Sequence, residues 1–285
     1  MKKLLKNVVA ICSLLAVVLI ICNVKVNAED VEKTWISYLG TSSVTKNACF
    51  KEDEASEHYY EFMIGNSSSY ADVSAVIIDM PSDNLFEVSI VNEDTGEIEE
   101  NYDYGRSGNK MIYYISKPQK STKYLLTICN EYEENFNRVY SIKIDSLYKR
   151  GTYKAKFKPS TLTNPGKGKA VNSDAVYSNI GSLDLRKVTT IPNDAELTGV
   201  SESGTMSRRL GNTKMELTNG DSGVTYEGSL SFSGNVSVQF KDFRNSYDAV
   251  KTIWRVDYYT YAALASTFKN PEISITYRYN QYANF

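Results

Sequence analysis

Hydrophobic and polar residues alternate along this chain in short runs, and "EHYYEFMIG" (57–65) shows the pattern clearly. One face of this run would carry His58, Tyr60, Phe62 and Ile64. The other face would carry Glu57, Tyr59, Glu61 and Met63, and Gly65 ends the run. Because successive side chains of a strand point to opposite faces, the pattern predicts a β-strand with one buried face.

Further segments before residue 148 have the same character. They are 72–80, 85–92, 111–116, 123–129 and 138–144. Loops rich in Asn, Ser, Gly and charged residues separate them, without helical patterns between. Such spacing is typical of an antiparallel β-sandwich, and we expect one over 29–148.

The second half repeats the β pattern. The candidate strands are 182–188, 195–207, 213–219, 228–243, 252–263 and 272–279. The segment 228–243 has the form of a hairpin that turns at Ser233–Asn235. We therefore predict an all-β protein of two antiparallel, jelly-roll-like β-sandwiches, the second over 173–285.

Charge is distributed unevenly behind a formal net charge of −2. Residues 29–148 hold 22 Asp and Glu against 10 Lys and Arg, whereas residues 149–172 hold seven Lys and Arg and no acid. The latter segment includes "FKPSTLTNPGKGKA" (157–170), so it is expected to be a basic Pro/Gly linker between the modules. Its charge suits a solvated tether, or contact with an anionic cell wall. The acidic first half argues against nucleic acid as a partner.

The N-terminus has the layout of an export signal. Lys2, Lys3 and Lys6 precede the apolar run Val8–Cys22, and "VNA" ends at Ala28. This predicts a signal peptide over 1–28, cleavage after Ala28 and secretion. The run is shorter than the roughly 20 residues of a membrane span, so no span is expected in the mature chain. Retention as an N-terminal anchor is the alternative.

Two cysteines, Cys49 and Cys129, would remain after cleavage. Export would permit a disulfide between them. Such a bridge closes a long loop and would stabilise the fold by roughly 4 kcal/mol. The alternative is two unrelated buried thiols.

The segment 46–145 resembles the bacterial pre-peptidase C-terminal domain, a secreted β-sandwich. The resemblance is carried by "KEDEASE", "YYEFMI", "VSAVIIDMPSDNLFEVSIVNEDTGEI", "STKYLLTICN" and "RVYSIKI". It implies an accessory module that aids secretion or binds a macromolecule, usually beside a hydrolase. The family usually has acidic residues just before the Tyr pair, where Ser56 and His58 stand here. That departure weakens the transfer of a calcium site from relatives such as clostridial collagen-binding domains.

The sequence offers little for catalysis. His58 is the only histidine, so neither a zinc site of the HExxH type nor a Ser-His-Asp triad has its parts. Glu57 and Glu61 would point away from His58 on the strand. Two-carboxylate chemistry needs no histidine, and acids are plentiful, but no pair stands out. We therefore expect no enzymatic activity, with a carboxylate-dependent hydrolase as the alternative.

Calcium is the cofactor that the acidic runs favour, because hard cations bind clustered carboxylates. The candidate ligands are Glu52, Asp53, Glu54, Glu57 and Asp94. The alternative is a solvated acidic loop.

Aromatic residues near the C-terminus are the candidate binding residues, since exposed aromatic rings stack on sugars or grip proteins. They are Trp254, Tyr259, Tyr261, Tyr277 and Tyr279. Alternation sets Tyr259 and Tyr261 opposite Trp254, so one set is expected in the core and the other at the surface.

These features together predict a secreted, non-catalytic binding protein. Its ligand would be an extracellular polymer or protein, such as a glycan, the cell wall or a matrix protein. A structural or assembly role at the cell surface is a further alternative.

Overall fold

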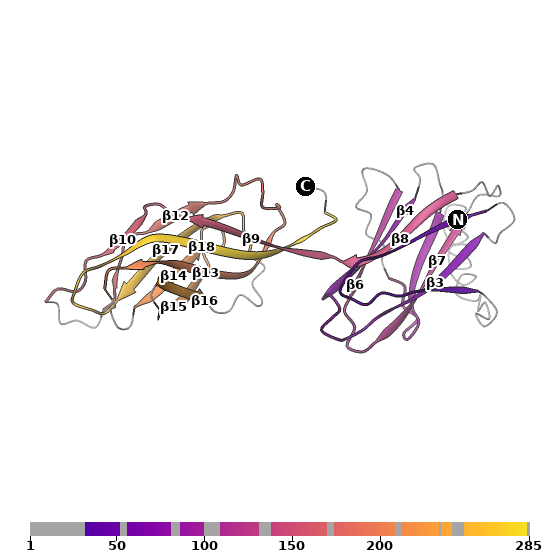
Figure 1. Ribbon diagram of the computed structural model, residues 1–285, viewed down its shortest axis with the longest axis horizontal. Helices are drawn as coiled ribbons and strands as arrows, with labels where there is room; N and C mark the ends of the chain where they lie inside the picture. The colour runs from indigo at the N-terminus through magenta and orange to yellow at the C-terminus, as the bar shows by residue number, and fades with distance from the viewer. Residues whose placement is uncertain are drawn as a thin grey trace, which may run out of the picture.

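The chain forms two β-sandwiches placed end to end in the computed structural model (Figure 1). The structure describes residues 32–51, 56–80, 86–99, 109–130, 138–169, 174–208, 213–233, 235–240 and 248–283. No helix able to cross a membrane occurs within these ranges. The predicted signal peptide, 1–28, lies outside the described residues. The all-β prediction is confirmed.

The first sandwich packs two four-stranded sheets face to face. Its strands are β1 (Lys33–Ile36), β2 (Val44–Phe50), β3 (Glu57–Ile64), β4 (Val73–Met80), β5 (Phe86–Asn92), β6 (Asn109–Ser116), β7 (Thr122–Asn130) and β8 (Arg138–Ser146). One sheet has the order β1-β3-β7-β5 and the other β2-β8-β4-β6. All neighbours are antiparallel except β1 and β3.

The alternation in β3 holds as predicted. Phe62 and Ile64 are fully buried in the core between the sheets. His58 points the same way, stacks on Phe50 with ring centroids 4.0 Å apart, and shares a hydrogen bond of 2.5 Å with the Tyr140 hydroxyl. The histidine is therefore a packed residue at the edge of the core.

The second sandwich consists of one continuous sheet folded over a single core. Its strands are β9 (Tyr148–Lys156), β10 (Thr161–Asn164), β11 (Val176–Tyr177), β12 (Gly181–Asp184), β13 (Glu196–Met206), β14 (Lys214–Asn219), β15 (Thr225–Ser233), β16 (Asn235–Phe240), β17 (Ile253–Thr260) and β18 (Ser266–Asn280). The main path is β10-β18-β13-β16-β15-β14-β17-β11, with β9 beside β18 and β12 beside β17. β15 and β16 form the predicted hairpin, in which Ser233 faces Asn235.

The described part of the expected linker, 149–169, is not a tether. Most of it lies in β9 and β10, which both pair with β18. The misleading signal was charge, because β9 is an edge strand that alternates exposed residues such as Lys154 with half-buried ones such as Tyr153. Lysines at a sheet edge discourage unwanted pairing, and they have the same composition as a solvated linker.

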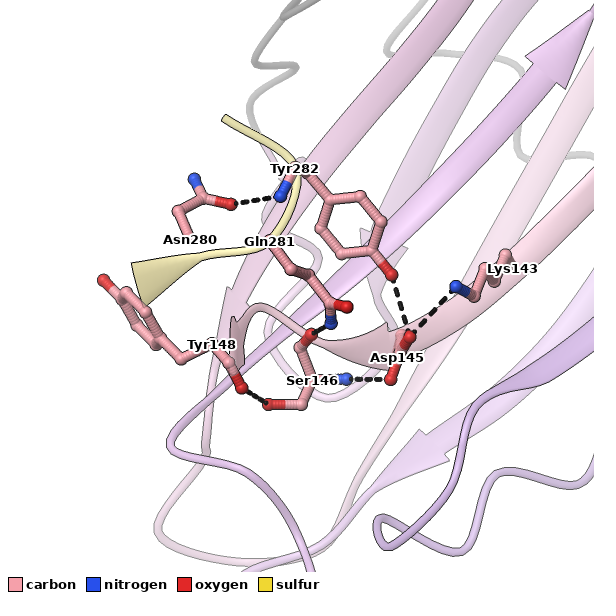
Figure 2. Close-up of polar contacts among 7 residues, drawn as sticks. All are labelled: Lys143, Asp145, Ser146, Tyr148, Asn280, Gln281 and Tyr282. Atoms are coloured by element: carbon pink, nitrogen blue, oxygen red, sulfur yellow. Dashed lines mark hydrogen bonds and ion pairs between the residues drawn. The ribbon is translucent and has the colours of Figure 1, made fainter. Parts of the chain in front are cut away.

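The two sandwiches meet across a single residue, Leu147, which separates β8 from β9 (Figure 1). The end of the chain returns to this junction (Figure 2). The Tyr282 hydroxyl donates to Asp145 Oδ2 at 2.8 Å, and the Gln281 backbone N–H donates to the Leu147 carbonyl at 3.1 Å. Lys143 holds the same carboxylate at 3.0 Å. The last described residues are thus hydrogen-bonded to the segment that connects the two sandwiches.

The junction explains why β4 is apolar on both faces. Val76 and Ile78 point into the sandwich core, whereas Ala75 and Ile77 point to the outer face, yet both are buried. Leu147 belongs to the same buried cluster as Ala75 and Ile77, and Tyr148 and Tyr282 pack against it. A strand buried on both faces carries a continuous apolar run rather than an alternating one.

The predicted Cys49–Cys129 disulfide is not formed, and both residues are thiols. Cys49 follows the half-buried Ala48 and precedes the buried Phe50 in β2, so its side chain points to the outer face of that sheet. Cys129 lies between the buried Ile128 and Asn130 in β7, on the outer face of the opposing sheet. Two packed sheets are about 10 Å apart, whereas a disulfide needs Cα atoms within about 7 Å. The two thiols point away from each other across the whole sandwich.

Candidate binding surface on the second sandwich

Strands β14, β15 and β17 present one face of the second sandwich to solvent. In β14, Met215 and Leu217 are buried in the core, and Glu216 between them points outward. In β17, the same alternation buries Val256 and turns Asp257 outward. The binary pattern of these strands therefore decides which side chains reach the surface.

Three carboxylates stand side by side on this face, and we call them the carboxylate row. Glu216 of β14 lies opposite Glu227 of β15 on one side and opposite Asp257 of β17 on the other. Directly opposed residues of antiparallel strands have Cβ atoms about 5 Å apart. Like charges at that spacing repel, so the row is a feature that the fold holds at a cost in stability.

The environment divides the row into two kinds of carboxyl group. Burial, with the charge of Glu216 as a second cause, raises the pKa of Asp257 to about 6. Burial and the charge of Glu227 also raise the pKa of Glu216. In contrast, hydrogen bonds from Lys214 and then Tyr259 lower the pKa of Glu227. Near pH 6 the row thus offers both carboxylate acceptors and a protonated hydroxyl donor.

Three tyrosines lie beside the carboxylate row, and we call them the tyrosine cluster. Tyr177 and Tyr261 each expose 48 % of their surface, and Tyr259 lies between them. The Tyr259 hydroxyl donates to Glu227 at 2.6 Å, which joins the cluster to the row. Lys167 places its ammonium 5.2 Å from the centre of the Tyr261 ring. The surface therefore combines apolar rings with hydrogen-bonding groups of both kinds.

The three rings do not form a flat platform. Tyr177 and Tyr259 have centroids 5.2 Å apart and planes 42° apart. Tyr259 and Tyr261 are 6.0 Å apart and nearly perpendicular, at 88°. A ligand that contacted all three would have to bend or twist around the cluster.

The structure brings together two of the five predicted aromatic residues, Tyr259 and Tyr261. Trp254 is fully buried and donates its indole N–H to the Val250 carbonyl at 3.1 Å, so it is a core residue. Tyr277 is also buried, and the half-buried Tyr279 packs against the same core. Trp254 and Tyr277 are therefore core residues, and Tyr279 lies at the edge of the same core, away from the tyrosine cluster.

Tyr177 and the carboxylate row were not predicted from the sequence. Tyr177 belongs to a two-residue strand, which is too short for a periodic pattern. The three carboxylates come from strands far apart in sequence, and only the register between strands makes them neighbours. The one sequence signal was the outward position of Glu216 and Asp257 in the predicted strands 213–219 and 252–263, and Glu227 lies just before the predicted strand 228–243.

The predicted calcium ligands do not assemble among the residues described. Glu52, Asp53 and Glu54 lie outside the described residues. Glu57 accepts a hydrogen bond from Tyr59 and pairs with the far end of β7, at Cys129. Asp94 instead lies beside the start of β7 and forms an ion pair with Lys120 at 3.2 Å.

Residues 123 and 129 of β7 are about 20 Å apart along an extended strand, so Glu57 and Asp94 do not share an ion. Within the described ranges, no group of three or more His, Cys, Asp or Glu is placed to hold a metal.

No family model matches the sequence, and no curated protein matches it either. Among solved structures, the chain is similar to the pre-peptidase C-terminal domain of collagenase from Bacillus anthracis, with 14 % identity and a TM-score of 0.29. That match covers 40 % of this chain and 95 % of the other. The resemblance predicted from the sequence is thus confirmed, as a matter of fold, over part of the chain.

Two other solved structures match most of the chain. One is a protein from Eubacterium rectale described as secreted, with 9 % identity, a TM-score of 0.35, and coverage of 84 % of this chain and 75 % of the other. Another is the tandem CBM22-1–CBM22-2 domain of Xyn10C from Paenibacillus barcinonensis. It has 8 % identity and a TM-score of 0.25, and the match covers 84 % of this chain and 88 % of that one.

Proposed function

We propose that this chain is an exported binding protein that recognises an extracellular polysaccharide through the tyrosine cluster and the carboxylate row. The observation that carries the proposal is the gathering of exposed tyrosines beside hydrogen-bonding carboxyl groups on one sheet face. Aromatic faces stack on the apolar faces of sugar rings, and carboxylates accept strong hydrogen bonds from hydroxyl groups.

Two exposed apolar residues lie near the cluster along the chain. Ile180 is 57 % exposed and lies three residues after Tyr177, and Leu264 is 56 % exposed and lies three residues after Tyr261. Large apolar side chains that gather at a surface mark an interaction site more often than those scattered singly. The angled rings favour a polymer that twists along its length over a flat crystalline one.

The test is retention of the secreted chain on a panel of insoluble polysaccharides. Export with cleavage after Ala28 would give Glu29 as the first residue of the material collected outside the cell. We expect wild type to be retained by at least one polymer, and the double variant Y177A/Y261A to lose about tenfold or more in affinity, since each stacked ring contributes on the order of 1 kcal/mol.

Trp35→Ala is the matched control, because Trp35 is also 48 % exposed but lies on the first sandwich. Equal loss in the control and the double variant would contradict the proposal, as would no retention on any polymer. Release of soluble sugar that Asp257→Asn abolishes would instead establish the hydrolase, since Asp257 and Glu227 have pKa values pushed in opposite directions.

A further inference from the structure

A second surface of the same sandwich lies over β9, β18 and β13, on the half of the sheet away from the tyrosine cluster. It contains a hollow of about 450 Å³. The lining residues are Arg150, Gly151, Thr152, Thr198 and Thr276. The Thr276 hydroxyl donates to the Gly199 carbonyl at 3.1 Å, so the donors that face the hollow are the hydroxyls of Thr152 and Thr198 and the guanidinium of Arg150.

The hollow depends on an irregularity in β13. Leu197 pairs with Tyr277 and Gly199 pairs with Thr276, which leaves Thr198 as an extra residue in the strand. Such a β-bulge bends the strand and re-aims one side chain, here Thr198, toward the hollow. Regular pairing of β13 with β18 would not place this hydroxyl there.

Gly151 completes the floor. The Tyr277 ring lies so close against it that a Cβ at this position would overlap the ring. The missing side chain lets β9 lie close against Tyr277 on its core side, and Arg150 and Thr152 point to the outer side.

The charge around the hollow is positive. Arg150 is exposed, and its guanidinium forms no ion pair or hydrogen bond within the described part of the chain. Lys154 follows on the same face of β9, about 13 Å from Arg150 along the strand. The nearest acid on β13, Glu196, is held by Arg278 at 2.8 Å, and Glu272 faces Lys156 in the pairing of β9 with β18. Neither Arg150 nor Lys154 has a charged partner among the described residues, so both charges are available to a ligand.

We propose that this hollow binds a phosphate group of an extracellular anionic polymer. A tetrahedral phosphate accepts hydrogen bonds from several directions at once, so it suits the Thr152 and Thr198 hydroxyls beside Arg150 better than a planar carboxylate would. Arg150 supplies the planar fork that recognises phosphate through paired hydrogen bonds. Lys154 attracts the neighbouring charge of the same polymer. The segment that looked like a basic tether is, in β9, the basic wall of this site.

The test measures binding of fluorescently labelled linear polyphosphate to the secreted chain by anisotropy, at low and at physiological salt. Arg150→Gln should weaken binding about tenfold, because a hydrogen-bonded charge pair is lost. Lys149→Gln is the matched control: it removes the same charge from the adjacent exposed residue, which points to the opposite face of β9. It should change affinity less than about twofold, and the salt dependence should fall only for Arg150→Gln.

A variant that changes no charged residue distinguishes a specific binding site from non-specific electrostatic attraction. Thr152→Val with Thr198→Val keeps every charge and should still weaken polyphosphate binding severalfold. Equal effects of Arg150→Gln and Lys149→Gln would overturn the proposal, as would an inert threonine variant or the absence of polyphosphate binding at low salt. Dextran sulfate or polyglutamate bound as tightly as polyphosphate would overturn the assignment to phosphate. Since Y177A/Y261A leaves this face intact, its polyphosphate binding should equal wild type whatever the outcome for neutral polysaccharides.

Discussion

Glu202 carries a carboxyl group into the core of the second sandwich. It is 2 % exposed, and neither carboxyl oxygen has a hydrogen-bond partner. Its cross-strand neighbours are Val238 and Ile273, which are apolar and fully buried. Burial raises the pKa of Glu202 well above its ordinary value, so the group is neutral in the folded chain at mildly acidic pH.

We predict that Glu202 makes the protein less stable as pH rises. The folded state keeps the proton above the unfolded pKa of about 4.3, so the free energy of unfolding falls by up to about 1.4 kcal/mol per pH unit from there to the raised pKa. Glu202→Gln cannot titrate and should lose this slope. Urea unfolding of both proteins from pH 5 to pH 8 measures it, and parallel stability curves would contradict the assignment.

Among the strands, β4 contributes to two hydrophobic clusters, the core of the first sandwich and the cluster at the junction. Its inner face belongs to the first sandwich, and its outer face packs under Leu147, Tyr148 and Tyr282 at the junction. The stability of the first sandwich is therefore linked to the strand that leaves it and to the chain end that returns.

Ile77→Ala tests this linkage. Ile77 points to the outer face of its sheet but is only 6 % exposed, so the truncation should cost about 2–4 kcal/mol of unfolding free energy, as for a core residue. Val139 lies on the same outer face in β8 and is 56 % exposed, so Val139→Ala should change stability by less than about 0.5 kcal/mol. Chemical denaturation monitored by tryptophan fluorescence compares them; similar small losses would show that the junction does not bury β4.

Strand positions and faces were predictable from alternation, as β3 and the β15–β16 hairpin show. The partners of each strand were not, because register is a property of pairs and the sequence pattern describes single strands. Alternation also indicates which candidate residues are buried. Trp254 lies on the same strand face as Val256, and Tyr277 lies on the same face as Ile275, so both are core residues. Tyr259 and Tyr261 had the outward parity and reached the surface. For the cysteines, alternation placed only Cys129, on the outer face of its predicted strand, because no strand was predicted around Cys49.

In the whole molecule, the second sandwich carries two different surfaces and is connected to the first through Leu147. The tyrosine cluster lies near the turn from β17 to β18, and β18 then runs back to the junction, where Asn280 donates to the Tyr114 hydroxyl at 3.1 Å. The cluster is thus at the end of the molecule away from the first sandwich (Figure 1). The arrangement suits an extended polymer that reaches the far end while the first sandwich stays free for another contact.

Hydroxyl-radical footprinting of the purified chain, with and without the polysaccharide that retains it, tests the proposed binding surface most directly. If the polysaccharide binds at the tyrosine cluster, saturating polymer should protect Tyr177 and Tyr261 from labelling and leave the labelling of Trp35 unchanged. Unchanged labelling of both tyrosines at saturation, or protection confined to the first sandwich, would contradict it.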